Sequence, residues 1–162
     1  MSALPNRRAL LFAFAGVVLP SAARGQGDAE SAVLVRALYE REIARHNARQ
    51  RVGEAEFLAP FARDTQAVWR KARDDKRPTH DPAGPILNAF FGWGVLPGHE
   101  VTLAGVAQPA ELFVAVRLAV RGRTRTATVQ LVREAGALRI ADIAYESGES
   151  FLAYNRRRAG TK

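Results

Sequence analysis

The chain contains no cysteine, so it forms no disulfide and offers neither a thiol nucleophile nor an N-terminal cysteine for lipid attachment. No serine lies in a Gly-x-Ser-x-Gly elbow, and no glycine-rich phosphate loop follows a predicted strand. These absences exclude cysteine nucleophiles, serine nucleophiles in such an elbow and nucleotide sites built on a glycine-rich loop. We therefore predict no cofactor.

The chain also lacks an apolar run long enough to cross a membrane, which requires ~20 residues. The longest run, Ala9 to Leu19, is about half that length. Arg7 and Arg8 precede it, and Pro20 and the small residues 21–23 follow. A basic segment, an apolar segment and small residues, in this order, are typical of a secretory signal peptide.

We therefore predict that residues 1–25 are a cleaved signal peptide and that residues 26–162 form one soluble periplasmic or secreted domain. The two arginines also resemble the twin-arginine export signal. Asn6 and Leu10 depart from that pattern, so the general secretory route and the twin-arginine route both stay open.

The formal net charge is +8, and Arg7, Arg8 and Arg24 supply three of these positive charges. The other basic residues are spread along the chain, and only Arg156–Arg158 form a run in its last part. This distribution favours a short basic C-terminal tail over specific nucleic-acid binding.

Helical spacing of apolar residues dominates the first half of the mature chain. It predicts a helix from Asp28 to about Arg51 and a second helix from Phe61 to the charged run before Pro78, with one short helical turn between them. Residues 78–98 break the pattern with four prolines and three internal glycines around an apolar kernel. We interpret this segment as an ordered lid whose aromatic rings cover one end of the core.

The period changes to two after this segment, which is typical of strands. Strands are predicted at 99–107, 111–121, 124–133 and 137–145, with Gly122 and Gly136 in the turns and a closing helix at 150–158. The order predicts an α+β fold in which N-terminal helices pack on a curved antiparallel sheet of about four strands.

Three short motifs accompany this order: Ala37-Leu38-Tyr39, His80-Asp81-Pro82, and the segment from Gly136 to Ile143. Together with the predicted elements they resemble the nuclear-transport-factor-like (cystatin-like) superfamily, and within it a family of small exported bacterial proteins of unknown function. The resemblance implies a cone-shaped fold over residues 32–154. Some relatives in the superfamily are isomerases, dehydratases or polyketide cyclases that use an acid or a histidine inside the cone, and others have no activity.

Asp142 is the first candidate for such chemistry, because it lies among apolar residues in the last predicted strand. If Leu138, Ile140, Asp142 and Ala144 face the core, burial would raise the pKa of Asp142 toward the range that suits proton transfer. If the alternate residues face the core, Asp142 lies outside and is free to pair with Arg117. The structural role is the favoured interpretation.

Asp81 is the second candidate base, next to His80 and before Pro82, where an acid also suits a turn or a helix cap. Neither these residues nor His46 and His99 have metal-ligand spacing, so we predict no metal site. His46 lies on the apolar stripe of the first helix and is interpreted as a core or rim histidine.

Four aromatic side chains, Tyr39, Trp69, Trp93 and Tyr145, are the candidate ligand-binding residues. Core filling is the alternative for each of them. Tyr39 and Trp69 stand out because their polar atoms need partners when they are buried.

Three functions stay open. The first is a non-enzymatic exported module that binds a small apolar ligand or a protein partner. The second is an isomerase or dehydratase that uses Asp142 or Asp81. The third is a dimerising interaction or immunity protein that pairs through the outer sheet face, with Arg117, Thr126, Thr128 and Gln130.

Overall fold

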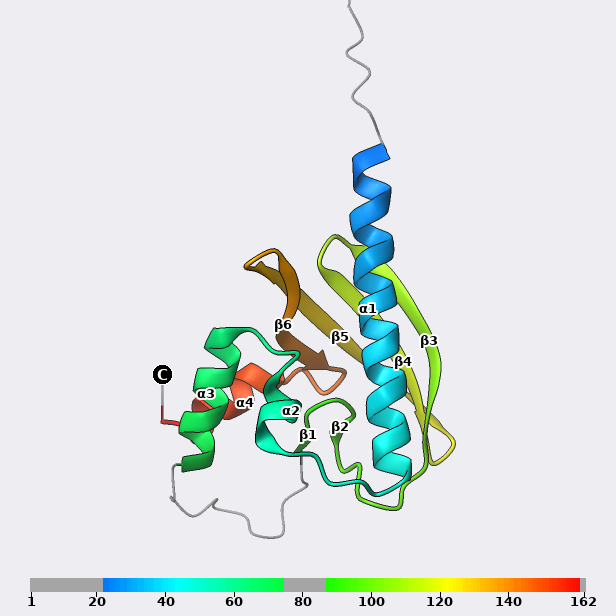
Figure 1. Cartoon of the computed structure of the whole chain (residues 1–162). Helices are drawn as coiled ribbons and strands as arrows, with labels where there is room; N and C mark the ends of the chain where they lie inside the picture. Colours follow the sequence, from blue (N-terminus) through cyan, green and yellow to red (C-terminus); the bar gives the residue numbers. More distant parts are fainter. Residues whose placement is uncertain (1–21, 75–86, 161–162) are drawn as a thin grey trace, which may run out of the picture.

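A long helix crosses one side of a four-stranded sheet, and three shorter helices gather at the other end of that sheet (Figure 1). The computed structural model describes residues 22–74 and 87–160, and side chains from Glu30 onward. The helices are α1 (Ala22–Asn47), α2 (Glu54–Leu58), α3 (Arg63–Asp74) and α4 (Phe151–Arg158).

The main sheet has the antiparallel order β3-β4-β5-β6, formed by β3 (Val101–Ala110), β4 (Phe113–Val120), β5 (Arg123–Glu134) and β6 (Ala137–Tyr145). A second, two-stranded sheet joins β1 (Leu87–Asn88) to β2 (Gly92–Trp93). The predicted α+β fold and the four-stranded sheet are therefore confirmed. The predicted lid segment is a hairpin over residues 87–93, and residues 78–86 of it lie outside the described part.

Two tight turns connect the strands where the glycines predicted them. Arg121 and Gly122 both have positive φ, as do Ala135 and Gly136. Two successive residues of this conformation make the turn whose twist matches that of antiparallel strands. Glycine at the second position adopts it without steric cost, which explains why these two positions end the strands.

The strand β3 begins later than its sequence pattern predicts, at Val101 instead of His99. The amide of His99 closes a turn onto the carbonyl oxygen of Leu96, at 3.0 Å. The side-chain amide of Asn47 then exchanges two hydrogen bonds with the backbone of Val101, at 2.9 and 3.1 Å. The end of α1 is thereby tied to the start of this edge strand.

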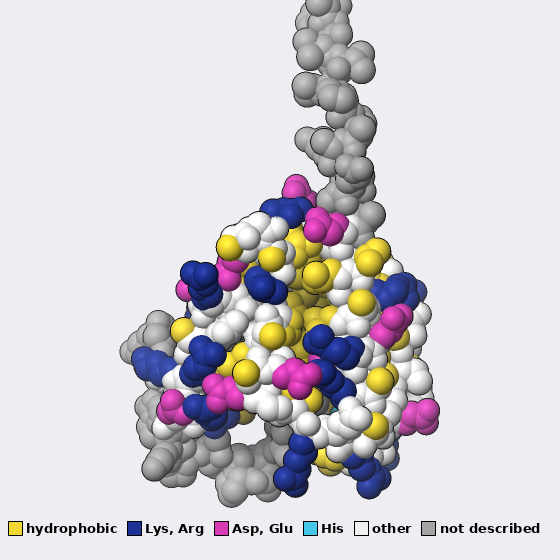
Figure 2. All heavy atoms as spheres, in the orientation of Figure 1, with side chains coloured by type: hydrophobic (Ala, Val, Ile, Leu, Met, Phe, Trp, Pro, Cys, Tyr) yellow, Lys and Arg dark blue, Asp and Glu magenta, His cyan; other side chains and the backbone are white. Residues whose placement is uncertain are grey.

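The buried face of α1 follows helical spacing through Ser31, Val35, Leu38, Tyr39, Glu42 and Ile43. It packs on β3 and β4, and the inward residues of β4 alternate along the strand. Hydrophobic side chains gather in a depression beside α1, and charged side chains of both signs surround them (Figure 2). None of the helices in the described part of the chain is long and apolar enough to cross a membrane.

A β-bulge in β6 reverses the inward face of that strand. Leu138 and Ile140 are buried before it, and Ile143 and Tyr145 are buried after it. The two alternatives considered for Asp142 both assumed that side chains alternate without interruption along the whole strand. Both are wrong, because the extra residue at the bulge moves the side chains after it to the opposite face. The bulge turns the carbonyl of Ala141 and the side chain of Asp142 toward the helices at this end.

The outer edge of β6 is covered by the segment before α3. Ile140 donates its amide to the carbonyl of Pro60 at 2.9 Å and accepts from the amide of Ala62 at 2.8 Å. Phe61, between them, is fully buried and stacks on Phe151 with ring centroids 5.2 Å apart. The ring of Phe61 thereby links the sheet edge to α4.

Candidate functional site

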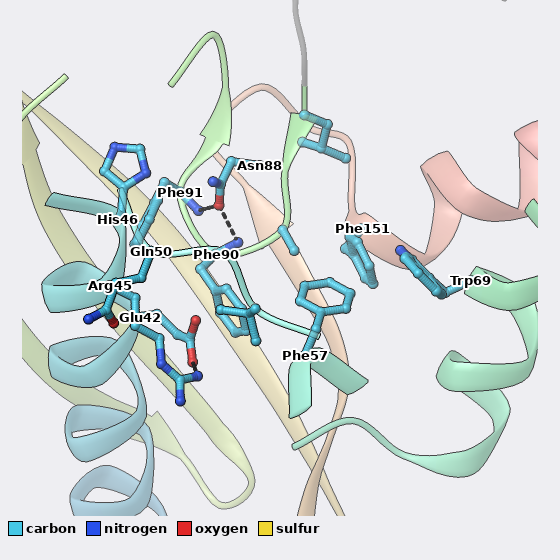
Figure 3. Close-up of a pocket in the computed structure, with 13 residues that line it drawn as sticks. Glu42, Arg45, His46, Gln50, Phe57, Trp69, Asn88, Phe90, Phe91 and Phe151 are labelled. Atoms are coloured by element: carbon cyan, nitrogen blue, oxygen red, sulfur yellow. Dashed lines mark hydrogen bonds and ion pairs between the residues drawn. The ribbon is translucent and has the colours of Figure 1, made fainter. Parts of the chain in front are cut away.

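A pocket of about 300 Å³ opens where α1 meets the β1–β2 hairpin and the three short helices. Figure 3 shows charged side chains of α1 on one side of it and the rings of Phe57, Phe151 and Trp69 on the other. We call it the aromatic pocket. Its lining residues are Glu42, Arg45, His46, Gln50, Val52, Phe57, Trp69, Leu87, Asn88, Ala89, Phe90, Phe91 and Phe151.

Phe57 of α2 is the centre of the ring cluster that forms the apolar wall. Its ring centroid lies 5.4 Å from that of Trp69, 5.6 Å from that of Phe61 and 6.1 Å from that of Phe90. The rings meet at tilted or edge-on angles, which aromatic pairs prefer. Such a wall suits a flat apolar molecule.

Glu42 supplies a carboxylate to the polar side of the pocket, which Arg45, His46 and Gln50 also line. The residue is 9 % exposed, and Arg41 and Arg45 both donate to its Oε1 at 3.0 Å. Its Oε2 has no hydrogen-bond partner among the residues that the structure describes. One acceptor atom of a buried carboxylate therefore remains available to the pocket.

Arg45 connects this carboxylate to the neighbouring helix, because its second terminal nitrogen pairs with Glu56 of α2. Glu56 does not line the pocket, and its side chain is 57 % exposed. The two acids thus share one arginine from opposite sides. Only Glu42 faces the pocket.

Two further polar side chains lie on the hairpin side of the pocket. The Nε2 atom of His46 donates to the carbonyl oxygen of His99 at 2.9 Å, because a carbonyl oxygen can only accept. Asn88 accepts the amides of Phe90 and Phe91 at 3.0 and 3.2 Å (Figure 3). Its side chain thereby closes the hairpin turn that presents both rings.

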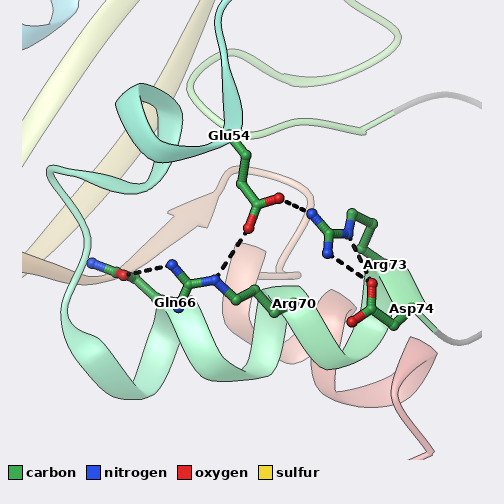
Figure 4. Close-up of polar contacts among 5 residues, drawn as sticks. All are labelled: Glu54, Gln66, Arg70, Arg73 and Asp74. Carbon is green, nitrogen blue, oxygen red and sulfur yellow. Dashed lines mark hydrogen bonds and ion pairs between the residues drawn. The ribbon is translucent and has the colours of Figure 1, made fainter.

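An ion-pair network holds α2 against α3 behind the apolar wall (Figure 4). Glu54 pairs with Arg70 at 3.1 Å and with Arg73, and Arg73 also pairs with Asp74 at 2.8 Å. The guanidinium of Arg73 lies over the ring of Trp69, 5.3 Å from its centroid. These contacts orient the two helices that carry Phe57 and Trp69.

The four predicted ligand-binding aromatics do not share one pocket. Trp69 lines the aromatic pocket, whereas Trp93 and Tyr145 line a second one of about 180 Å³ on the other side of the hairpin. Phe91 lines both pockets. Tyr39 lines neither and is fully buried in the core.

The two buried tyrosines differ in their hydroxyl groups. Tyr145 donates to the carbonyl oxygen of Ala89 at 2.6 Å, whereas the hydroxyl of Tyr39 has no partner among the described residues. Burial raises the pKa of Tyr39, and burial together with the nearby charges of Tyr39, Asp142 and Glu149 raises the pKa of Tyr145. Both side chains therefore stay neutral over the ordinary pH range.

Asp142 is a structural acid. Its Oδ1 accepts the amides of Ile143 and Leu152, both at 2.8 Å, and so caps the first turn of α4 beside the N-cap residue Ser150. The alternative prediction that Asp142 pairs with Arg117 is wrong. Arg117 lies on β4 opposite Thr126, and β5 separates it from Asp142. Asp142 lines neither described pocket.

None of the remaining candidates that the structure describes lines the aromatic pocket. Asp81 and His80 lie outside the described residues. The side chains of Arg117, Thr126, Thr128 and Gln130 alternate with the buried residues of β4 and β5, on the outer face of the sheet. Arg156–Arg158, predicted to form a tail, make up the last turn of α4. Over 22–74 and 87–160, no three His, Asp or Glu side chains are grouped to hold a metal ion.

Sequence reasoning missed Glu42, Arg45, Phe57 and Phe151. One signal was available for Glu42, because it follows Leu38 and Tyr39 at helical spacing and is therefore an acid on the apolar face of α1. No local pattern shows that Phe57 and Phe151 are in contact. They are 94 residues apart in the sequence, and only the fold brings them together.

No family model, no curated protein and no solved structure matches this chain. The resemblance to the nuclear-transport-factor-like superfamily stays a prediction.

Proposed function

We propose that this protein is an exported, non-enzymatic binding module that holds a small, largely apolar molecule in the aromatic pocket. The observation that carries the proposal is the pocket itself. It has a volume of about 300 Å³, and five aromatic rings and the buried carboxylate of Glu42 line it. Ligand pockets commonly combine mostly apolar walls with a few polar groups that orient the ligand.

The size of the pocket limits the ligand to a small molecule, because about 300 Å³ is the lower end of the range for small-molecule pockets. The walls come from α1, α2, α3, α4 and the hairpin, and a hydrogen bond or ion pair ties each of these elements to a neighbour. A site with walls anchored in this way loses little conformational entropy when it binds.

A binding role is favoured over catalysis because Asp142, the described candidate base, lines neither pocket and accepts two backbone amides through its Oδ1. Export is the second half of the proposal and rests on the order of the segments in residues 1–25. N-terminal sequencing of the exported protein tests it. We expect a start between Arg24 and Gln26, and an intact Met1 on a membrane-bound product would contradict it.

The two tryptophans provide a test of the binding site, because Trp69 lines the aromatic pocket and Trp93 does not. The mature protein, labelled with nitrogen-15, should give two indole N–H signals, which the variants Trp69→Phe and Trp93→Phe assign. Titration with indole should shift the Trp69 signal in a saturable manner and leave the Trp93 signal in place. Failure of indole, indene and benzofuran alike to shift Trp69 would overturn the proposed site.

A further inference from the structure

The polar groups of the aromatic pocket define the chemistry of its ligand more closely than its apolar wall does. We propose that the ligand is an uncharged ring compound with an N–H or O–H donor, which it directs to Oε2 of Glu42. This inference rests on the proposed binding function and deepens it by naming the ligand class.

The donor requirement follows from the two oxygens of Glu42. Arg41 and Arg45 both donate to Oε1, whereas Oε2 has no hydrogen-bond partner in the part of the chain that the structure describes. A carboxylate oxygen only accepts hydrogen bonds. A ligand without an N–H or O–H group would displace water from Oε2 and leave a buried acceptor unsatisfied, which is unfavourable.

The charges around the pocket argue for a neutral ligand. Glu42 and Glu56 contribute two negative charges, and Arg41 and Arg45 contribute two positive ones. A cation placed at Oε2 would lie close to the guanidinium that is only 3.0 Å from the same carboxylate, and an anion would meet the carboxylate itself. A neutral donor gains the hydrogen bond without either repulsion.

Three bicyclic compounds of nearly the same shape test the donor requirement directly. Indole carries an N–H donor, benzofuran carries a weak acceptor at the same position, and indene carries neither. We expect indole to bind the mature wild-type protein at least about tenfold more tightly than either of the others, since a hydrogen bond to a charged acceptor is worth about that factor. The Trp69 indole signal reports each titration.

Glu42→Gln is the decisive variant. With the amide oxygen held by Arg41 and Arg45, the amide NH₂ takes the place of Oε2, so the group that faces the pocket changes from acceptor to donor. The preference for indole over benzofuran should then disappear. Glu56→Gln is the matched control, because it also removes an acid from Arg45 but does not alter the pocket lining, and it should keep the preference.

The outcomes separate the two proposals. If the three compounds shift Trp69 with equal affinity in the wild-type protein, the donor inference is overturned and the binding function stands. Tighter binding of tryptamine, which adds an ammonium group to the same ring, would overturn the claim of a neutral ligand. Because the wild-type comparison needs no variant, these results hold even if Glu42→Gln fails to fold.

Discussion

The α1 side of the sheet and the end formed by α2, α3 and α4 are held together by different interactions. On the α1 side, Val35, Leu38 and Tyr39 pack on apolar residues of β3 and β4, and burial dominates. At the other end, burial of Phe61 and Phe151 is joined by directional polar contacts: Thr65 donates to the carbonyl of Ala141 at 2.6 Å, and Asp142 caps α4.

The difference explains where the pocket lies. An apolar interface closes until its side chains fill the available space. Hydrogen bonds and ion pairs instead hold two elements at a set separation, as Glu54 does between α2 and α3. The aromatic pocket lies along the boundary of the two regions, and its charged wall comes from the first and most of its ring wall from the second.

The largest expected effect is in the apolar region. Leu38→Ala removes a side chain that is 6 % exposed, and we expect the free energy of unfolding to fall by about 2–5 kcal/mol. Leu34→Ala, one turn earlier on the same helix and 37 % exposed, is the matched control and should cost about 1 kcal/mol or less. Urea unfolding measures both. Equal losses would show that α1 is not held by burial of this face.

The next effect concerns Tyr39 and Tyr145, whose raised pKa values lie above the unfolded value of about 10. The unfolded chain ionises first, so stability is fully present below pH 10 and is lost as the pH rises beyond it. Each tyrosine should contribute a slope of about 1.4 kcal/mol per pH unit. Urea unfolding at pH 9 and pH 11 measures the loss.

Phenylalanine variants separate these two tyrosines. Tyr39→Phe and Tyr145→Phe should each remove the part of the stability loss at alkaline pH that the substituted tyrosine causes. At neutral pH they should differ, because Tyr145→Phe leaves the carbonyl of Ala89 unpaired and costs about 1 kcal/mol, whereas Tyr39→Phe removes a hydroxyl without a described partner and should cost nothing. A similar neutral-pH loss in both variants would show that the Tyr39 hydroxyl is bonded in solution.

A smaller effect is expected at the bulge. Asp142→Ala removes the acceptor of two amides and should lower the free energy of unfolding by about 1–2 kcal/mol. Asp142→Asn keeps an oxygen in place and should retain most of that stability. Hydrogen exchange at the amide of Leu152 should quicken in the alanine variant alone, and equal exchange in both variants would argue against the cap.

The smallest effect belongs to the exposed ion pairs. Glu54→Gln should cost about 1 kcal/mol or less, and the loss should shrink as sodium chloride is added. Glu40→Gln, which breaks one exposed pair with Arg36, is the control and should be nearly neutral. If the loss of stability from Glu54→Gln did not change with salt, the contribution of Glu54 would come from packing and not from charge.

Local patterns predicted most of the fold. The strand at Ala137–Tyr145 has the predicted bounds, and the alternation of β4 and the glycines of both turns were read correctly. The same patterns failed at Asp142, because a bulge inserts one residue without any marker such as glycine or proline. They also predicted one ligand site for four aromatics, of which three are divided between two separate pockets and Tyr39 lines neither.

The amino-acid sequence by itself determined the α+β class, the order of helices and strands and the positions of the tight turns, because periodicity and turn chemistry depend on residues within a few positions of one another. Only the tertiary structure decided that Glu42 faces Phe57 and Phe151, and that Asp142 caps a helix. These contacts join residues far apart in the chain, and their geometry results from how α1, the bulge in β6 and the β1–β2 hairpin pack together.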